Sequence, residues 1–326
     1  MSNLKIAVLG PIPYDRITTH RGQVLEKYGC ALYTTVALAT LLDPADVICP
    51  IVHVRRQDEV PIKRLLEPFG NVDVSGIRSH TDRGDVVELN YVDQNTRVER
   101  QTGFMAPITP IDLAGVLDAD AFVCVPITDY EVGLDTLKFI KGNSSGLVLL
   151  DAHGPTNSLT RGGERFHRLW AERDSWLPSV DILKMNLEEA GCSWFPPGDA
   201  PGGTTTGRPL PTSELPGFAR HCLARGVRSV CVTLDQHGCA VFELDSIGRL
   251  VEHHIDRLPV DHVVDTTGCG DSFAAGMAFG YLRYHDIVQA ARFGNAMGAQ
   301  RCAGSELAIY RPLAETERQI ALAYAA

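Results

Sequence analysis

Short runs of apolar residues recur along the chain, and each is followed by a segment of helical length. These runs are residues 6–9, 47–54, 121–125, 147–150, 180–184 and 230–234. Continuous apolar runs are typical of strands buried on both faces, as in a parallel sheet covered by helices. Helices are expected over residues 32–42, 62–67, 131–141, 164–173, 214–225, 271–283 and 286–302. The alternation predicts an α/β fold with a doubly wound, mostly parallel sheet flanked by helices.

Residues 83–101 depart from this alternation. They contain VVELNYV, four polar residues at 93–96, and then RVERQ. Polar and apolar residues that alternate on both sides of a turn predict a half-exposed antiparallel hairpin. We expect it to project from the main sheet as a small β flap; an edge hairpin without a special role is the alternative. Residues 196–216 are rich in Gly, Pro and Thr, which predicts a surface loop.

Charge and cysteine content narrow the class of protein. The 326 residues include 30 basic and 40 acidic side chains, a formal charge of −10. Such a chain has no general attraction for nucleic acids or anionic membranes. Its apolar stretches are shorter than the roughly 20 residues of a membrane span, and residues 1–10 lack the layout of a secretory signal. Nine cysteines without a C-x-x-C pair indicate reduced thiols, so we expect a cytoplasmic protein.

The segment from Val263 to Leu282 is the most informative one. Gly268-Cys269-Gly270 follows an extended run and precedes a helical pattern. Glycines at a helix start allow several N–H groups to point at one spot, where the helix dipole adds positive potential. This predicts an anion site with Asp271 at its edge. Gly276 and Gly280 are expected to let this helix approach the sheet closely.

Other interpretations of the same residues can be compared with the sequence. A dinucleotide fingerprint needs glycine at position 273, which is Phe273. A nucleophile elbow around Ser272 needs glycine at position 274, which is Ala274. Both fail. That Asp271 only caps the helix is an alternative that stays open.

Residues 265–273, DTTGCGDSF, continuing through Ala275-Gly276, resemble the C-terminal signature of the ribokinase family, the phosphofructokinase-B (PfkB) type carbohydrate kinases. The resemblance implies one ribokinase-like domain over residues 1–326, with a small β-sheet lid from about 16–33 and 80–105. In that family the glycine-rich turn binds the transferred phosphate, and the aspartate accepts the proton of the substrate hydroxyl. Gly268, Cys269 and Gly270 would then supply amides, and Asp271 would be the base. Cys269 stands where the family usually has alanine, and a thiol there is open to oxidation.

Other segments extend the resemblance over nearly the whole chain. Asp15 matches an aspartate that binds substrate hydroxyls. Asn186 and Glu189 match an N-x-x-E motif that acts around Mg²⁺ and phosphate, often through water; a helix N-cap with glutamate at its third position is the alternative. Thr233 and Gly238 match a strand and turn that contact nucleotide phosphates. Asn295 matches an asparagine on the adenine-side helix, or is a buried polar residue.

The resemblance is weaker before the first helix. Where many family members have G-G-x-x-x-N to hold the sugar, this chain has Gly29, then Cys30, and Thr34 in place of the asparagine. A hydroxyl offers fewer and shorter contacts than a carboxamide. We expect Gly29 and Thr34 to contact a substrate other than a simple furanose. Tyr33 either stacks against a substrate ring or packs in the core.

The resemblance implies a kinase that transfers the γ-phosphate of ATP, with Mg²⁺, to a hydroxyl of a sugar or polyol. A monovalent cation such as K⁺ beside the anion site and a homodimer formed through the lid are further implications. The helix N-terminus is expected to keep Asp271 ionised. One alternative is a nucleoside kinase, which needs an aromatic slot, from Tyr14, Tyr33, Tyr91 or Phe104. Another is a ligand-binding protein of the same fold without catalysis.

Overall fold

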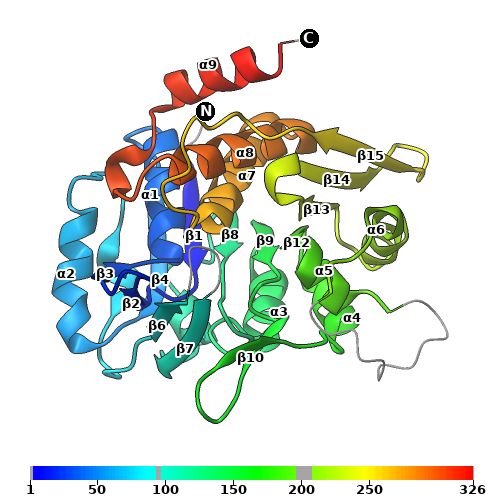
Figure 1. Cartoon of the computed structure of the whole chain (residues 1–326). Helices are drawn as coiled ribbons and strands as arrows, with labels where there is room; N and C mark the ends of the chain where they lie inside the picture. The colour runs from blue at the N-terminus through cyan, green and yellow to red at the C-terminus, as the bar shows by residue number, and fades with distance from the viewer. Residues whose placement is uncertain (1–2, 93–96, 196–207, 326) are drawn as a thin grey trace.

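The computed structural model of the chain describes residues 3–92, 97–195 and 208–325. Its strands in the large sheet are β1 (Lys5–Leu9), β4 (Val47–His53), β5 (Ile77–Arg78), β8 (Ala121–Cys124), β9 (Leu147–Asp151), β12 (Ile182–Asn186), β13 (Ser229–Thr233), β14 (Cys239–Leu244) and β15 (Leu250–Ile255). Within the described residues their order is β15-β14-β13-β12-β9-β8-β1-β4-β5 (Figure 1). All six predicted apolar runs lie in this sheet.

The sheet is parallel from β13 to β5, and only β14 and β15 pair antiparallel. Strands β8 and β9 are buried over their whole length, as are the first four residues of β12 and β13. This confirms the prediction of strands covered on both faces. Because the strands run parallel, the carboxyl ends of β9, β12 and β13 meet at one edge of the sheet.

Helices cover both faces of the large sheet (Figure 1). They are α1 (Ala31–Leu41), α2 (Arg56–Leu66), α3 (Leu134–Asn143), α4 (Arg173–Trp176), α5 (Leu187–Ser193), α6 (Leu215–Leu223), α7 (Cys269–Tyr284), α8 (Ile287–Cys302) and α9 (Leu313–Ala323). Helix α7 packs between α1 and α8 and contacts β8 and β9, whereas α6 packs on β13, β14 and β15. The predicted α/β architecture with a doubly wound sheet is confirmed, and the arrangement brings the start of α7 to the carboxyl edge of the strands.

A second, four-stranded sheet lies beside that edge (Figure 1). Its strands are β2 (Tyr14–Thr18), β3 (Val24–Tyr28), β6 (Val86–Tyr91) and β7 (Arg97–Gly103), in the order β3-β2-β6-β7. The antiparallel pair β6–β7 confirms the predicted hairpin, whose turn at residues 93–96 lies outside the described residues. Val87 and Leu89 are buried while Asn90 is exposed, as the alternating pattern predicts.

The helix predicted over residues 164–173 is wrong. Arg165–His167 instead form strand β11, which pairs antiparallel with β10 (Asn157–Leu159). The hairpin turns at Gly163, whose φ of 84° lies in the left-handed region that favours glycine. Helix α2 also begins earlier than predicted, at Arg56, and continues through Pro61. Of the loop predicted over 196–216, residues 196–207 lie outside the described part, and Leu215 already begins α6.

Gly276 and Gly280 allow a close approach, but to a helix rather than to the sheet. A Cβ at Gly276 would collide with the carbonyl oxygen of Phe293, and one at Gly280 would stand 2.8 Å from Ala290 Cα. Both neighbours belong to α8. The antiparallel packing of α7 against α8 therefore requires these small residues, and the prediction about the sheet is wrong.

No helix in the described parts of the chain is long and apolar enough to cross a membrane. All nine cysteines lie within those parts, and all are free thiols. The cytoplasmic setting stays a prediction.

Candidate active site

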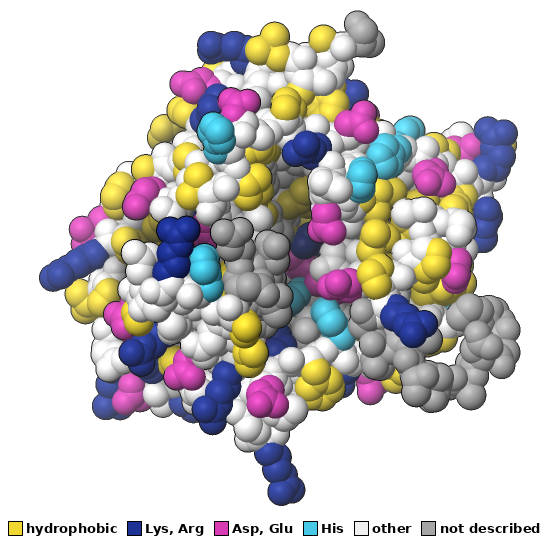
Figure 2. Space-filling view, viewed as in Figure 1, with side chains coloured by type: hydrophobic (Ala, Val, Ile, Leu, Met, Phe, Trp, Pro, Cys, Tyr) yellow, Lys and Arg dark blue, Asp and Glu magenta, His cyan; other side chains and the backbone are white. Residues whose placement is uncertain are grey.

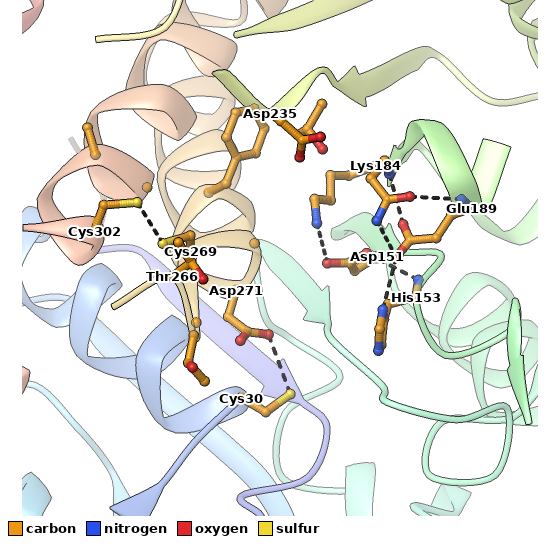
Figure 3. A pocket seen from close by; sticks show the side chains of 18 of the residues that line it. Cys30, Asp151, His153, Lys184, Glu189, Asp235, Thr266, Cys269, Asp271 and Cys302 are labelled. Atoms are coloured by element: carbon orange, nitrogen blue, oxygen red, sulfur yellow. Dashed lines mark hydrogen bonds and ion pairs between the residues drawn. The ribbon is translucent and has the colours of Figure 1, made fainter. Parts of the chain in front are cut away.

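A pocket of about 620 Å³ lies where β9, β12 and β13 end and α7 begins. Figure 2 shows the hollow in the middle of this face, and Figure 3 shows its walls. In open α/β sheets ligands bind at this edge. The predicted site residues that line the pocket are Asp15, Asn186, Glu189, Thr233, Gly238, Gly268, Cys269, Gly270, Asp271 and Asn295. Segments far apart in the sequence therefore meet around one cavity.

Gly268 forms the turn at the start of α7. Its φ of 85° lies in the left-handed region, which a residue with a side chain rarely adopts. The Cys269 N–H donates back to the Thr266 carbonyl at 3.3 Å. The N–H groups of Gly270 and Asp271 have no acceptor among the described residues, as is usual in the first turn of a helix. The N–H groups of Gly270 and Asp271 are thus available to an anion, whereas that of Cys269 is used in a hydrogen bond within the turn.

The Asp271 carboxylate points into the pocket from the first turn of α7 (Figure 3). Its Oδ1 accepts a hydrogen bond from Cys30 Sγ at 3.4 Å, and its carbonyl oxygen accepts one from Thr34 Oγ1 at 3.1 Å. Gly268 is the N-cap of the helix, so the alternative in which Asp271 only caps it is wrong. Asp271 is thus partly buried and held by one contact to its carboxylate and one to its backbone carbonyl.

Burial raises the pKa of Asp271 above its ordinary value, and the nearby charge of Asp151 adds to the effect, while Lys184 opposes it. The helix N-terminus was expected to favour the ionised form, but burial and a like charge outweigh it. A carboxylate whose pKa is shifted toward neutrality is a better proton acceptor at neutral pH than an ordinary aspartate.

A buried ion pair faces Asp271 across the pocket (Figure 3). Lys184 Nζ lies 2.6 Å from Asp151 Oδ2, and both side chains are about 6% exposed. Burial alone would lower the pKa of Lys184, but the charges of Asp151 and Glu189 outweigh it and raise the pKa. A Cβ at Gly270 would stand 3.1 Å from Lys184 Nζ, so this ammonium group lies directly beside the anion turn.

Sequence reasoning missed the Lys184–Asp151 pair. Each residue adjoins an apolar run, and the register of β9 with β12 places them opposite one another. The available signal was a charged residue near the carboxyl end of a buried parallel strand, which is where such folds bind ligands.

Asn186 and Glu189 form a reciprocal cap at the start of α5. Asn186 Oδ1 accepts from the Glu189 N–H at 2.8 Å, and Glu189 Oε2 accepts from the Asn186 N–H at 2.8 Å. Glu189 Oε1 also lies 2.9 Å from His153 Nδ1. The alternative in which this motif forms a helix N-cap with glutamate at its third position is therefore confirmed. Because the Glu189 oxygens already have partners, these residues fit Mg²⁺ only through its bound water.

The described residues include no group of three or more His, Cys, Asp or Glu side chains that could hold a metal directly. Mg²⁺ in phosphoryl-transfer sites usually keeps several waters and is bound by few protein groups together with substrate phosphates. The residues present fit that outer-sphere arrangement.

Thr233, Gly238 and Asn295 also line the pocket. Thr233 Oγ1 donates to the Met185 carbonyl at 3.4 Å, and Gly238 lies so close to Ile255 that a Cβ would collide with its carbonyl oxygen. Asn295 is buried and its Nδ2 donates to the Asp256 carbonyl at 3.0 Å. The alternative of a buried polar helix residue is thus confirmed for Asn295, although it also borders the pocket.

Asp15 lines the end of the pocket under the small sheet. Burial raises its pKa to about 7, although Lys27 and Arg165 favour the ionised form. Gly29 lies against it, because a Cβ there would stand 2.7 Å from Asp15 Oδ2. Arg165, which the sequence did not single out, lines the same end and lies 3.7 Å from Glu99 Oε2.

Gly29, Tyr33 and Thr34 were expected to contact substrate, but all three lie behind the pocket wall rather than in it. Gly29 leaves room for Asp15, and Thr34 holds the backbone of Asp271. Tyr33 is 2% exposed and packs behind Gly268, so it belongs to the core. The aromatic residues named for the alternative of a nucleoside kinase, Tyr14, Tyr33, Tyr91 and Phe104, are not among the residues that line the pocket.

Two cations hold the carboxylate that precedes the turn. Asp265 Oδ2 lies 2.6 Å from Lys27 Nζ and 3.0 Å from Arg301 Nη2, while Oδ1 accepts from the Thr267 N–H at 2.8 Å. Burial opposes ionisation, but Lys27 and the hydrogen bonds from Thr267 lower the pKa of Asp265 to about 2. Arg301 is fully buried, and its guanidinium carbon lies 4.5 Å from the centre of the Tyr33 ring. The acceptor sites of Asp265 are therefore occupied by the protein itself.

The whole fold resembles that of ribokinase-family kinases. A ribokinase of Arabidopsis thaliana, solved with ribose and ATP, superposes with a TM-score of 0.72 at 17% identity, covering 98% of this chain and 99% of that one. A pyrophosphate-dependent kinase in the ribokinase family, solved with a pyrophosphate analogue and myo-inositol, superposes with a TM-score of 0.71 at 19% identity, covering 96% and 99%. The protein has a ribokinase-like fold, as predicted.

Parts of the sequence match a known family and a known protein. Residues 167–310 match the profile of the pfkB family carbohydrate kinases. A 2-dehydro-3-deoxygluconokinase of Bacillus subtilis is 35% identical over 135 residues, which cover 40% of this chain and only 36% of that protein. The match thus spans about a third of the length of this relative. The predicted resemblance is confirmed: residues 167–310 of this chain match the PfkB family of carbohydrate kinases.

Proposed function

We propose that this protein is an ATP-dependent kinase that phosphorylates a hydroxyl group of a sugar or related polyol. The observation that carries the proposal is the position of Asp271, a carboxylate with a raised pKa at the N-terminus of α7, facing a buried lysine across a pocket. A proton acceptor, two amides without partners and an ammonium group are the parts that phosphoryl transfer to an alcohol requires.

In this mechanism the acceptor hydroxyl lies between Asp15 and Asp271, and Asp271 takes its proton. The amides of Gly270 and Asp271, the helix dipole and Lys184 stabilise the charge on the transferred phosphoryl group. Because the transition state of such reactions is loose, catalysis consists mainly of positioning and charge stabilisation. Asn186 and Glu189 would hold Mg²⁺ through water, and the metal would offset charge on the donor phosphates.

The donor is proposed to be ATP rather than pyrophosphate. Beyond the anion turn the pocket continues along Val260, Val263 and Ala299. Val263 is 60% exposed, which leaves an apolar surface uncovered at the mouth of the pocket. A purine base covers such a surface, whereas pyrophosphate has no apolar part to bind there. Thr233 and Gly238 border the same side, next to the phosphates of the proposed nucleotide.

The small sheet is proposed to act as a lid over the acceptor. Val87 and Leu89 of β6 line the pocket next to Asp15 of β2. Closing this apolar surface over the substrate would exclude the water that otherwise competes for the phosphoryl group. The segments at about 16–33 and 80–105 would then form an insertion in a single domain rather than a second domain.

Arg165 supports a second candidate for the acceptor, a sugar acid. Its guanidinium lines the acceptor end of the pocket, and it lies 3.3 Å from His153 Nε2. An arginine fork binds a carboxylate through two parallel hydrogen bonds. The name of the Bacillus subtilis relative, a 2-dehydro-3-deoxygluconokinase, agrees with an acidic sugar. A nucleoside acceptor is less favoured, because the tyrosines and the phenylalanine proposed for its base lie outside the pocket.

A homodimer through the lid is a further proposal. Val24 and Leu25 of β3 and Val98 of β7 are about half exposed, and these strands form the two edges of the small sheet. Edge strands with exposed apolar side chains readily pair with another chain. The molar mass in solution tests this proposal.

The test of function is an ADP-release screen over pentoses, hexoses, inositols, sugar acids and nucleosides, with Asp271→Asn as the blank. We expect one chemical class of acceptor to stimulate ADP release by the unaltered protein and not by the variant. Tight binding of a sugar without any stimulation would favour the non-catalytic alternative. Stimulation by nucleosides alone would replace the sugar proposal.

A further inference from the structure

Two cysteines meet at the edge of the pocket. Cys269 is the first residue of α7 and Cys302 is the last of α8, and their Sγ atoms lie 3.0 Å apart (Figure 3). Both side chains line the pocket. Since α7 and α8 pack antiparallel, the pair closes the helical hairpin at the end that carries the anion turn.

This pair differs from the other thiols in its accessibility. Cys269 and Cys302 are partly exposed, whereas the other seven cysteines are buried. Cys231 and Cys239 also form a sulfur hydrogen bond, but both are 0% exposed. An oxidant dissolved in water therefore reaches Cys269 and Cys302 through the pocket and has no such route to Cys231 and Cys239.

The surroundings also activate one of the two sulfurs. A hydrogen bond from the Cys269 thiol lowers the pKa of Cys302 to about 7, although burial opposes it, and the adjacent Arg301 guanidinium favours the thiolate. As the donor, Cys269 has a raised pKa. The thiolate is the form of cysteine that reacts with peroxides and disulfides.

We propose that Cys269 and Cys302 are a redox-modification site whose reversible disulfide switches off the anion turn. The Cys302 thiolate attacks one oxygen of hydrogen peroxide and breaks the O–O bond, which gives a sulfenic acid and, after proton uptake, water. The Cys269 sulfur then attacks Cys302 Sγ, and the sulfenic oxygen leaves with the thiol proton as a second water. Two thiols are oxidised while one peroxide is reduced, and an added dithiol such as dithiothreitol reverses the change.

The disulfide would move the turn because its bond is shorter than the present contact. An S–S bond is about 2.05 Å long, so the sulfurs must approach by roughly 1 Å from their separation of 3.0 Å. Cys269 begins α7 and Cys302 ends α8, two helices of 16 residues each, and an irregular segment adjoins each cysteine, so part of the shift falls on residues 268–271. A misplacement of about 1 Å in a catalytic site can lower turnover by about 100-fold. This consequence rests on the proposed function of the turn.

The experiment treats the reduced full-length protein with hydrogen peroxide, alkylates the remaining thiols and measures both intact mass and turnover. We expect the oxidised protein to carry two alkyl groups fewer than the reduced protein alkylated in the same way, a cross-linked peptide that joins residues 269 and 302, and a loss of turnover of about tenfold or more that dithiothreitol restores. Cys302→Ser should keep the untreated turnover and become resistant to peroxide. Cys30→Ala is the matched control, because it removes the other thiol near Asp271 but keeps the pair. Peroxide should still lower the turnover of this variant, compared with its turnover before treatment.

Inactivation of Cys302→Ser at the rate of the unaltered protein would overturn the proposal, as would an inactivated protein without the cross-link. A cross-linked protein with full turnover would overturn the switch. The cross-linked peptide is measured without kinase activity, so it separates the two proposals. If no acceptor is phosphorylated, the proposed function fails, while the cross-link still tests the cysteine pair. If the protein is an active kinase but forms no cross-link, only the proposal of a redox site fails.

Discussion

The ring of Tyr33 lies directly behind Gly268, at the point where the anion turn begins. A Cβ on residue 268 would stand 2.6 Å from Tyr33 Cε2, and the φ of 85° at this position disfavours any side chain. Arg301 covers the ring from a distance of 4.5 Å, so the ring has little freedom to withdraw. The conformation of the turn thus depends on packing from the first helix.

Gly268→Ala should therefore lower both stability and turnover. We expect a loss of about 1–2 kcal/mol in the free energy of unfolding, from the left-handed conformation, and about a 100-fold fall in turnover from displacement of the turn. Gly270→Ala is the control for stability, because residue 270 has no positive φ and its Cβ would meet only Lys184 Nζ at 3.1 Å. Chemical denaturation and steady-state kinetics measure both effects, and normal turnover of Gly268→Ala would contradict the account.

Removing one partner of the Lys184–Asp151 pair should destabilise the protein more than removing both. Lys184→Met leaves the Asp151 carboxylate buried without its ammonium partner, which costs about 3–5 kcal/mol. The double variant Asp151→Asn/Lys184→Met should regain most of this stability while turnover stays low, because the ammonium group beside the anion turn is still missing. A double variant with restored turnover would show that Lys184 serves only stability.

Binding of the acceptor should weaken as the pH falls through neutrality, because the pKa of Asp15 is raised to about 7. Below this pH the carboxyl group is protonated and loses an acceptor for substrate hydroxyls. We expect the KM for the acceptor to rise about tenfold between pH 8 and pH 6, while the KM for ATP changes little. Asp15→Asn should have a high acceptor KM that no longer depends on pH; a pH dependence identical to that of the unaltered protein would remove Asp15 from the substrate site.

Asp15 should also affect the stability of the fold, and here the protonated form, not the ionised form, is favourable. Because the pKa of Asp15 is higher in the folded than in the unfolded chain, folding favours the protonated form, and that contribution is lost as the pH rises through about 7. Asp15→Asn should therefore unfold at a higher temperature than the unaltered protein at pH 8, and the difference should shrink toward pH 4. Thermal unfolding at the two pH values measures it.

Turnover should not depend on K⁺. A monovalent cation beside the turn would need carboxylate or carbonyl oxygens, but the Asp265 carboxylate is already held by Lys27, Arg301 and the Thr267 N–H. We expect equal rates, within about twofold, in potassium chloride and tetramethylammonium chloride at matched ionic strength. Lys27→Met, which frees one position on Asp265, is the variant in which a response to K⁺ should appear. A strong K⁺ requirement of the unaltered protein would contradict this assignment.

The sequence was most informative where chemistry depends on neighbours along the chain. Residues 265–273 form one continuous turn and helix start, so their pattern predicted an anion site, and the apolar runs predicted the parallel sheet. The Lys184–Asp151 pair escaped because it depends on the register between two strands 33 positions apart. The error at residues 164–173 arose because Gly163, not apolar spacing, decides the local structure there.

Gly29, Tyr33 and Thr34 illustrate a different limit. They adjoin the pocket, but whether a side chain faces the cavity or supports it from behind depends on packing between α1 and α7. From the sequence alone, Tyr33 could stack on a substrate ring or pack in the core. Its contact with Gly268 places it in the core.

The most direct test of the central claim is the turnover of Asp271→Asn at saturating ATP and acceptor, compared with the unaltered protein. If Asp271 is the base, turnover should fall by about 10²–10⁴-fold while the affinity for ATP stays within a few-fold. Near-normal turnover of Asp271→Asn would show that another group accepts the proton and would contradict the mechanism.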